Sequence, residues 1–290
     1  MTRLEDRDID HIARHLDEYD AHLKRMTGAS LRQIACMAAG VDEALLVDLV
    51  DRVRIAAVPV SSGLGVIGGF CGAVAAIVSR LGFETFVTES CDIAGIAEGF
   101  EKGADILMLA DDDRFVALTA GRRHVVDNTQ ATAQGFVAGL ELMKGGVAGE
   151  SVLVLGCGPV GMAAAKALID RGADVALCDI QQERALAALR EIDQDASDRI
   201  RMEVSPHTAV ERYELIFDAT NVGDFIEPAH LTPHTMVAAA GMPCALTPEA
   251  MVKHRDRVLH DALEIGTATM AVQAAAHLAT SVETKKAHEE

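Results

Sequence analysis

The sequence predicts an α/β protein, in which an N-terminal helical and α/β domain precedes a Rossmann-type doubly wound parallel sheet. Three observations lead to this fold class. The apolar residues are mostly aliphatic, with no Trp and two Tyr, as in parallel strands buried beneath helices. Short β-branched runs alternate with Ala-rich helical stretches. Finally, each half of the chain carries a glycine-rich turn between a strand and a helix.

The first half begins with helices. Apolar residues recur at helical spacing over residues 4–26, which predicts an amphipathic helix closed by Thr27-Gly28. A second helix is expected over Leu31–Ala39. The next expected elements are strands at 54–60, 84–88 and 104–110, with helices at 69–81, 94–102 and 131–143. The strands and the helices between them form a βαβαβ unit, and hence a parallel sheet.

Gly145, Gly146 and Gly149 mark the break to a second α/β unit. Its expected elements are strands at 151–155, 174–178, 215–218, 236–239 and 258–259, and helices at 162–171 and 183–192. A last helix is expected to start near Thr267. We therefore predict a substrate-binding domain over 1–148, an NAD-binding domain over 149–266, and a C-terminal helix and polar tail over 267–290.

Charge and cysteine content narrow the function classes. The formal charge of −18 repels phosphate backbones and anionic lipids, so neither nucleic acid nor a membrane is expected as a partner. The six cysteines are scattered without a Cys-x-x-Cys pair, which predicts no disulfide framework and no zinc site. His11 and His15 lack an evident third metal ligand and are interpreted as a solvated helix face. We expect a cytoplasmic protein, a homodimer, with no metal.

The second glycine turn fits a dinucleotide-binding fingerprint. It comprises Gly156, Cys157, Gly158, Pro159, Val160 and Gly161, and follows an apolar strand. The first glycine makes the tight turn, the second lets the backbone approach a pyrophosphate, and the third lets helix and strand pack closely. The amino end of the next helix would receive the anion.

Residues after the neighbouring strands complete the predicted cofactor site. Asp179 ends the second strand, where an acid would bind the adenosine ribose hydroxyls. No Arg follows at once to accept a 2′-phosphate, so NAD is favoured over NADP as the cofactor. Thr220 and Asn221 follow the next strand, and Gly241 follows the one after; both loops are candidates to lie over the cofactor, or else are simple turns.

The first glycine turn, Gly63–Gly68, fits the fingerprint less well. Pro59 interrupts the preceding strand, and the hydroxyls of Ser61 and Ser62 come before the first glycine. Hydroxyls and a helix amino end suit a substrate carboxylate. A second nucleotide, with Glu89 as its ribose acid, and an ordinary turn remain open as alternatives.

Two polar segments are further candidates. Asp111, Asp112 and Asp113 follow a predicted parallel strand, at the edge where α/β proteins place ligands. A carboxylate there can hold an ammonium group, although a solvated acidic loop gives the same pattern. Asn128 precedes a predicted helix and either binds a backbone-like group or caps the helix.

Segments outside the glycine turns are more specific. They are Val58–Gly63, Gly82-Phe83, Phe86–Thr88, Ile106–Met108, Ala110–Asp112, Gly241–Cys244 and Ile265–Ala268. With these segments the chain resembles the pyrrolysine synthase family from Leu4 to about Met270. Three departures touch the substrate pocket: Gly69 stands where the family has Asn, one residue is added within Leu107–Asp111, and the loop after Asn128 is about two residues longer.

The resemblance implies an NAD-dependent oxidation of the terminal amine of 3-methylornithyl-lysine, a dipeptide-like diamine. The resulting imine is hydrolysed with loss of ammonia, and the aldehyde condenses with an amine of the same molecule to form the pyrroline ring of pyrrolysine. Substrate-contacting positions of the family correspond to Leu4, Ser62, Ile67, Asp111 and Asn128. Asp111 is the expected catalytic residue, which would orient the amine and accept its proton.

Two other functions stay open. Another NAD-dependent amino-acid dehydrogenase would share the cofactor site and a cleft for its substrate. An NAD-sensing regulatory protein would share the cofactor site alone, but no basic DNA-binding helix is visible in the sequence. The N-terminal helix is expected to close over the substrate, with Thr27-Gly28 as its hinge. A permanently docked helix that only completes the core is the alternative.

Overall fold

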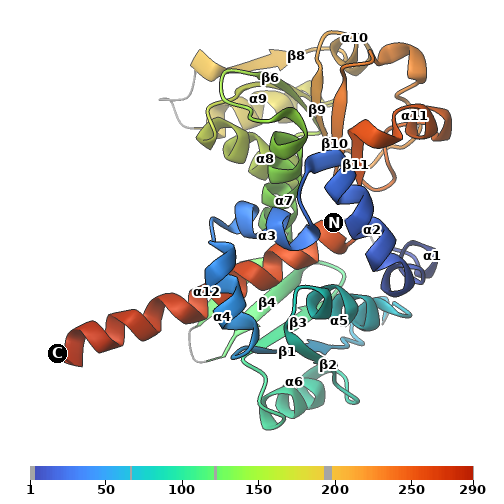
Figure 1. The fold of residues 1–290 in the computed structure, drawn as a ribbon. Coiled ribbons are helices and arrows are strands. Elements are labelled where there is room, and N and C mark those ends of the chain that lie inside the picture. Colours follow the sequence, from blue (N-terminus) through green and yellow to red (C-terminus); the bar gives the residue numbers. More distant parts are fainter. Residues whose placement is uncertain (1–3, 66, 121–122, 193–197, 290) are drawn as a thin grey trace. The chain divides into compact units, whose positions relative to one another are not determined.

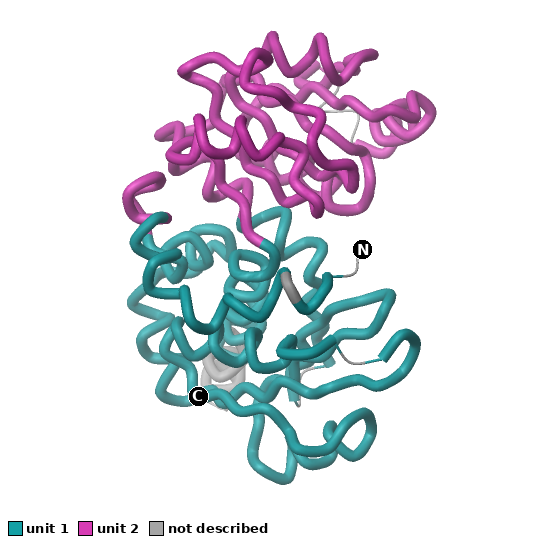
Figure 2. The backbone as a smooth tube through the Cα atoms, turned by 90° about the vertical axis from the view of Figure 1, so that its right-hand side faces the viewer, with its two compact units in different colours: residues 1–22, 30–135, 262–290 teal, residues 23–29, 136–261 magenta. Residues whose placement is uncertain are grey.

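The protein is described by a computed structural model that covers residues 4–65, 67–120, 123–192 and 198–289. Its contacts divide the chain into two compact units (Figure 2). Unit 1 comprises residues 1–22, 30–135 and 262–290, and unit 2 comprises residues 23–29 and 136–261. Each unit is built around one β-sheet.

The sheet of unit 1 has the strand order β2-β1-β3-β4-β5. Its strands are β1 (Arg54–Val58), β2 (Glu84–Val87), β3 (Ile106–Ala110), β4 (Phe115–Thr119) and β5 (His124–Asp127). The first three are parallel, as predicted, whereas β4 and β5 are antiparallel additions that the sequence analysis missed. Val58 ends β1 because the Pro59 that follows has no N–H for the strand ladder.

Helices surround this sheet (Figure 1). They are α1 (Asp6–Ile9), α2 (Ile12–Thr27), α3 (Leu31–Ala39), α4 (Glu43–Val50), α5 (Phe70–Arg80), α6 (Asp92–Glu101), α7 (Asn128–Lys144) and α12 (Glu264–Glu289); the last parts of α2 and α7 belong to unit 2. The single N-terminal helix predicted over 4–26 is therefore two helices. The last helix, expected from Thr267, begins three residues earlier and contacts α3, α4 and α5.

The sheet of unit 2 is entirely parallel, with the order β11-β10-β9-β6-β7-β8. Its strands are β6 (Ser151–Leu155), β7 (Asp174–Cys178), β8 (Ile200–Glu203), β9 (Leu215–Asp218), β10 (Met236–Ala239) and β11 (Val258–His260). Counted from β6, this is the 3-2-1-4-5-6 order of a Rossmann sheet. The predicted doubly wound fold is confirmed, and β8 is the strand of this sheet that the sequence analysis missed.

The helices of unit 2 are α8 (Pro159–Asp170), α9 (Gln182–Glu191), α10 (Pro206–Val210) and α11 (Pro248–Lys253), with short 3-10 turns at Pro228–His230 and Arg255–Arg257. Apolar residues of β6, β7, β9 and β10 form a continuous buried cluster in this unit. Among the helices that the structure describes, none has the length and apolar character of a membrane span.

Candidate functional site

The strand order of unit 2 defines where a ligand would bind. The crossover from β8 to β9 reverses the direction in which strands are added, so the switch point lies between the neighbouring strands β6 and β9. Ligands of such sheets bind beyond the carboxyl ends of the strands at this point. The predicted cofactor residues follow β6, β7, β9 and β10, and the structure therefore brings them to one edge of the sheet.

The three glycines of the second turn differ in what surrounds them. A Cβ on Gly156, which has φ +86°, would lie 2.8 Å from the Ala219 carbonyl oxygen, and a Cβ on Gly161 would lie 1.9 Å from the Gly156 oxygen. Both positions exclude a side chain because backbone atoms fill the space. A Cβ on Gly158, by contrast, would meet no atom within 4 Å. The structure thus leaves the approach to the second glycine open.

The helix that follows this turn presents its amino end at the same place. Gly158 is the N-cap of α8 and makes no side-chain cap hydrogen bond, and Pro159 is the first helical residue. Proline suits this position because it has no N–H to leave unpaired. The backbone N–H groups of Val160 and Gly161 belong to the first helical turn, which has no carbonyl partners within the helix. An anion at this point would receive those donors.

Asp179 lies directly behind the glycine turn. Its carboxylate accepts hydrogen bonds from Cys157 N and Gln181 N, each at 2.8 Å, and the residue is 7% exposed. The same side chain that was predicted to bind ribose hydroxyls therefore also fixes the conformation of the turn. Each carboxylate oxygen retains a further lone pair with which it can accept a hydroxyl hydrogen.

The loops after β9 and β10 are joined by an acid that the sequence analysis did not select. Asp218 is fully buried and accepts hydrogen bonds from Thr220 N at 2.9 Å, Thr220 Oγ1 at 2.7 Å and Ala245 N at 3.1 Å. Burial raises the pKa of Asp218, and these hydrogen bonds oppose that rise. Gly241 packs against the Thr220 backbone, since a Cβ there would lie 2.3 Å from the Thr220 oxygen. Asn221 is exposed beside them.

The first glycine turn, in unit 1, is held by carboxylates of the chain itself. Asp112 Oδ2 accepts from Leu64 N at 2.7 Å, and Asp6 Oδ1 accepts from Gly68 N at 3.0 Å. Ser61 donates its N–H, at 2.8 Å, and its hydroxyl to Asp92. In this structure the donors named here bind aspartates of the chain itself, and a substrate carboxylate at this turn remains a prediction.

The remaining predicted residues of this region stay accessible. Ser62 is exposed, and Ile67 and Leu4 are half-buried. Leu4 directly precedes α1, the helix whose Asp6 binds the glycine turn. Ile9 and Ile12 are each 1% exposed, so α1 and the start of α2 are docked in this structure. Movement of this segment remains a prediction.

Asp111 occupies a hairpin turn rather than an open strand end, because the antiparallel β4 follows β3 directly. Its Oδ1 accepts from Asp113 N at 2.9 Å and Arg114 N at 2.7 Å. These two backbone N–H groups, that of Arg114 foremost, lower the pKa of the exposed Asp111 carboxyl. A carboxylate with a lowered pKa is a weaker proton acceptor and a lasting negative charge. A lasting negative charge suits the predicted orienting role of Asp111 better than the predicted role of proton acceptor.

Asn128 is the first residue of α7, and its side-chain oxygen is buried with no hydrogen-bond partner in the described part of the chain. A Cβ on Gly266 would lie 3.0 Å from this oxygen, so α12 passes close to it. An unpaired buried carbonyl oxygen carries a free-energy penalty that a hydrogen-bond donor would relieve. An N–H group of a ligand is such a donor.

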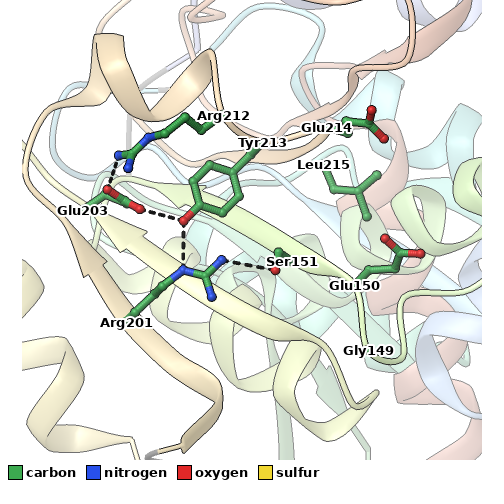
Figure 3. A pocket seen from close by; sticks show the side chains of 9 residues that line it. All are labelled: Gly149, Glu150, Ser151, Arg201, Glu203, Arg212, Tyr213, Glu214 and Leu215. Carbon is green, nitrogen blue, oxygen red and sulfur yellow. Dashed lines mark hydrogen bonds and ion pairs between the residues drawn. The ribbon is translucent and has the colours of Figure 1, made fainter.

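A separate pocket of about 680 Å³ lies elsewhere on unit 2 (Figure 3). It is lined by Gly149, Glu150, Ser151, Arg201, Glu203, Arg212, Tyr213, Glu214 and Leu215. The Tyr213 hydroxyl accepts from Arg201 Nε at 2.9 Å and donates to Glu203 at 2.7 Å. The lining contains none of the predicted site residues, and these polar side chains satisfy one another. For metals, the described residues offer no group of three or more ligating side chains.

Comparison with known proteins finds similarity over most of the chain. Residues 8–126 match a protein family described as pyrrolysine biosynthesis protein PylD, N-terminal domain. The pyrrolysine synthase of Methanosarcina acetivorans is 29% identical over 271 residues, which cover 93% of this chain and 98% of the relative. The pyrrolysine synthase of Methanosarcina barkeri is 28% identical over 275 residues, which cover 93% and 97%.

A solved structure shares the fold. The quinate dehydrogenase of Corynebacterium glutamicum, in complex with NAD, matches with a TM-score of 0.53 at 16% sequence identity, over 78% of this chain and 94% of that chain. At this identity the match shows a Rossmann-type dehydrogenase fold and nothing finer. Along nearly its whole length, the chain is similar to pyrrolysine synthases, so the resemblance noted from its sequence is confirmed.

Proposed function

We propose that this protein is a pyrrolysine synthase, an NAD-dependent dehydrogenase that oxidises the terminal amine of 3-methylornithyl-lysine. The observation that carries the proposal is the open Gly158 turn with Asp179 behind it, in a chain similar to pyrrolysine synthases over 93% of its length. Unit 2 then binds the cofactor, and Asp111 and Asn128 of unit 1 contact the substrate.

The residues of unit 2 fit a dinucleotide. The open space at Gly158 accommodates a pyrophosphate, and the first turn of α8 offers N–H donors and the positive end of the helix dipole. Exposed aliphatic side chains follow the strands β7, β8 and β9 at this edge: Ile180 is 84% exposed, Val204 60% and Val222 54%. An adenine ring would cover apolar surface of this kind. When bound, NAD supplies the hydride acceptor.

Asp179 supports NAD rather than NADP as the cofactor. A ribose 2′-hydroxyl can donate a hydrogen bond to its carboxylate, whereas a 2′-phosphate would bring like charges together. The neighbouring residues Ile180, Gln181, Gln182 and Glu183 include no cation to offset that repulsion.

Asp111 suits a cationic substrate group. Its lowered pKa keeps the carboxylate ionised, and Asp112 and Asp113 lie beside it in the same turn. A primary amine reaches such a site as an ammonium ion, which the carboxylate would attract and orient. The proton must leave before hydride transfer, and ring closure then needs chiefly the proximity of two groups in one molecule.

The proposed reaction balances as follows. The CH₂–NH₂ carbon loses a hydride and the nitrogen loses a proton, which gives an imine. One water adds, ammonia leaves, and an aldehyde remains. The aldehyde carbon then bonds to an amine nitrogen of the same molecule, and one water is lost as the pyrroline C=N bond forms. One NAD is reduced for each ring formed.

Purified full-length protein tests the proposal. NADH formation is followed with NAD and 3-methylornithyl-lysine, with lysine and ornithine as control diamines. The expected result is turnover with methylornithyl-lysine and a product with the mass of pyrrolysine. Faster oxidation of a control diamine would instead identify another amino-acid dehydrogenase. Binding of NAD without turnover of any substrate would identify an NAD-binding protein that is not this enzyme.

A further inference from the structure

A salt bridge connects the two segments of unit 1 that carry the proposed substrate contacts. Asp111 lies in the turn between β3 and β4, and Asn128 begins α7 after β5. Arg114, at the end of that turn, pairs with Asp127, which directly precedes Asn128. The pair therefore spans the two segments, and the sequence analysis assigned no role to either residue.

Arg114 fixes Asp111 through its backbone. Its N–H donates to Asp111 Oδ1 at 2.7 Å, and its carbonyl oxygen accepts from Asp111 N at 2.9 Å. These two bonds close the hairpin turn. The turn uses only Oδ1 of the Asp111 carboxylate as an acceptor, and not Oδ2. The orientation of the Asp111 carboxylate thus follows the position of Arg114.

Asp127 fixes Asn128 through the start of the helix. Its Oδ1 accepts from Thr129 N at 2.9 Å, which is the bond of a helix N-cap. Its Oδ2 accepts from both Nε, at 3.1 Å, and Nη2, at 2.8 Å, of Arg114. Burial raises the pKa of Asp127, but the bonds from Arg114 and Thr129 outweigh it and the net pKa is lowered.

We propose that Arg114 and Asp127 are positioning residues that hold the Asp111 carboxylate and the Asn128 amide in register for the substrate. This inference rests on the proposed function, because that function gives Asp111 and Asn128 their roles. Stability alone explains the pair less well than positioning does: the Arg114 side chain is 60% exposed and that of Asp127 is 28% exposed, and salt bridges open to solvent contribute little to stability. Two Arg114 nitrogens that donate to the single oxygen Oδ2 of Asp127 instead restrict the relative position of the two side chains.

The test compares Arg114→Gln, Asp127→Asn and the double variant with a control from the same sheet. The control is Glu84→Gln, which removes the salt bridge of Arg54 with Glu84, also 2.8 Å long, between β1 and β2. Each full-length variant is measured for KM, kcat, NAD affinity, melting temperature and amide hydrogen exchange at Arg114 and Thr129.

We expect each single variant to raise KM for methylornithyl-lysine on the order of tenfold, as for a misplaced substrate contact. NAD affinity and melting temperature should stay near wild type. The double variant should be no worse than the poorer single variant, because one pair is lost in all three. Arg114→Lys should raise KM less than Arg114→Gln does, since lysine keeps the positive charge but cannot donate two hydrogen bonds from a planar guanidinium. Exchange at Thr129 should quicken in Arg114→Gln, and Glu84→Gln should change none of these quantities.

The proposal is overturned if the effects of the two single variants add, if Glu84→Gln raises KM equally, or if Arg114→Gln leaves exchange at Thr129 unchanged. Failure of the proposed function gives a different result. If wild-type protein neither binds nor oxidises methylornithyl-lysine, the proposed function is lost. The exchange comparison still decides whether Arg114 positions the start of α7.

Discussion

Gly158→Ala separates cofactor binding from stability more cleanly than any other single change in the turn. The added methyl group would meet no atom within 4 Å, and Gly158 has φ −76°, which alanine adopts without strain. The free energy of unfolding should therefore stay within about 0.5 kcal/mol of wild type. The methyl group would, however, stand where a pyrophosphate approaches the backbone.

The expected loss of affinity follows from the size of that obstruction. Forcing a methyl group into an occupied space costs about 1–3 kcal/mol, which corresponds to a rise of roughly 5- to 160-fold in the Kd for NAD. Calorimetric titration with NAD measures the Kd, and thermal unfolding without cofactor measures stability.

Gly161→Ala is the matched control. Its Cβ would lie 1.9 Å from the Gly156 carbonyl oxygen, so the backbone must shift and the melting temperature without cofactor should fall. The reasoning is refuted if Gly158→Ala binds NAD as tightly as wild type, because the dinucleotide would then bind elsewhere. It is also refuted if Gly158→Ala destabilises the protein as much as Gly161→Ala does.

Three further predictions concern single carboxylates. Asp179→Asn should lower the ratio of the Kd for NADP to the Kd for NAD about tenfold. If this ratio is the same in the variant and in wild type, Asp179 does not select NAD over NADP. Asp111→Asn should lower kcat/KM for methylornithyl-lysine at least tenfold with unchanged NAD affinity. Unchanged turnover would show that the turn is a solvated acidic loop that does not contact the substrate. The hydrogen bond from Lys102, at 2.8 Å, and those from Glu89 N and Ser90 N lower the pKa of Glu98 from 4.5 to about 2. Since the folded-state pKa is lowered, Glu98 stabilises the protein above pH 4.5 and loses this effect as the pH falls towards 2. The difference in melting temperature between wild type and Glu98→Gln should thus shrink over that range, and a constant difference would contradict the assignment.

Unit 2 could be predicted from its sequence because local and global signals agree there. Apolar runs such as Val152–Leu155 are buried on both sides of the sheet, and buried parallel strands need such runs. The glycine turn depends on short-range geometry, and its spacing together with the apolar strand before it predicted a turn that the structure places directly after β6. The strand β8 escaped prediction because Ile200–Glu203 is only four residues long, two of them charged, and it lies at the edge of the sheet, where no residue is fully buried.

Unit 1 was harder to predict where structure depends on partners distant in sequence. The strand β4 pairs with both β3 and β5 in antiparallel register. This pairing cannot be predicted from the sequence of any one strand. Asp6 and Asp112 reach the first glycine turn from 62 and 48 residues away. A Gly-x-Gly pattern indicates a close approach to the backbone, but not whether a ligand or the chain's own carboxylates make it.

Two residues of the candidate sites carried signals that the sequence analysis left unused. Asp218 ends a run of three apolar residues, where a buried acid needs hydrogen-bond donors from its own loop. Asp127 stands immediately before a helical segment, which is a typical N-cap position. A search for acids at strand ends and helix starts would have found both.

Transfer of deuterium from the substrate tests the central claim most directly. Methylornithyl-lysine carrying two deuterium atoms on its terminal amine carbon is incubated with NAD and wild-type protein, and the reduced cofactor, ammonia and amino-acid product are measured. We predict one deuterium in the reduced cofactor, one equivalent of ammonia, and one deuterium retained on the C=N carbon of the pyrroline ring. A reduced cofactor without deuterium, or a ring formed without release of ammonia, would contradict hydride transfer from the amine carbon.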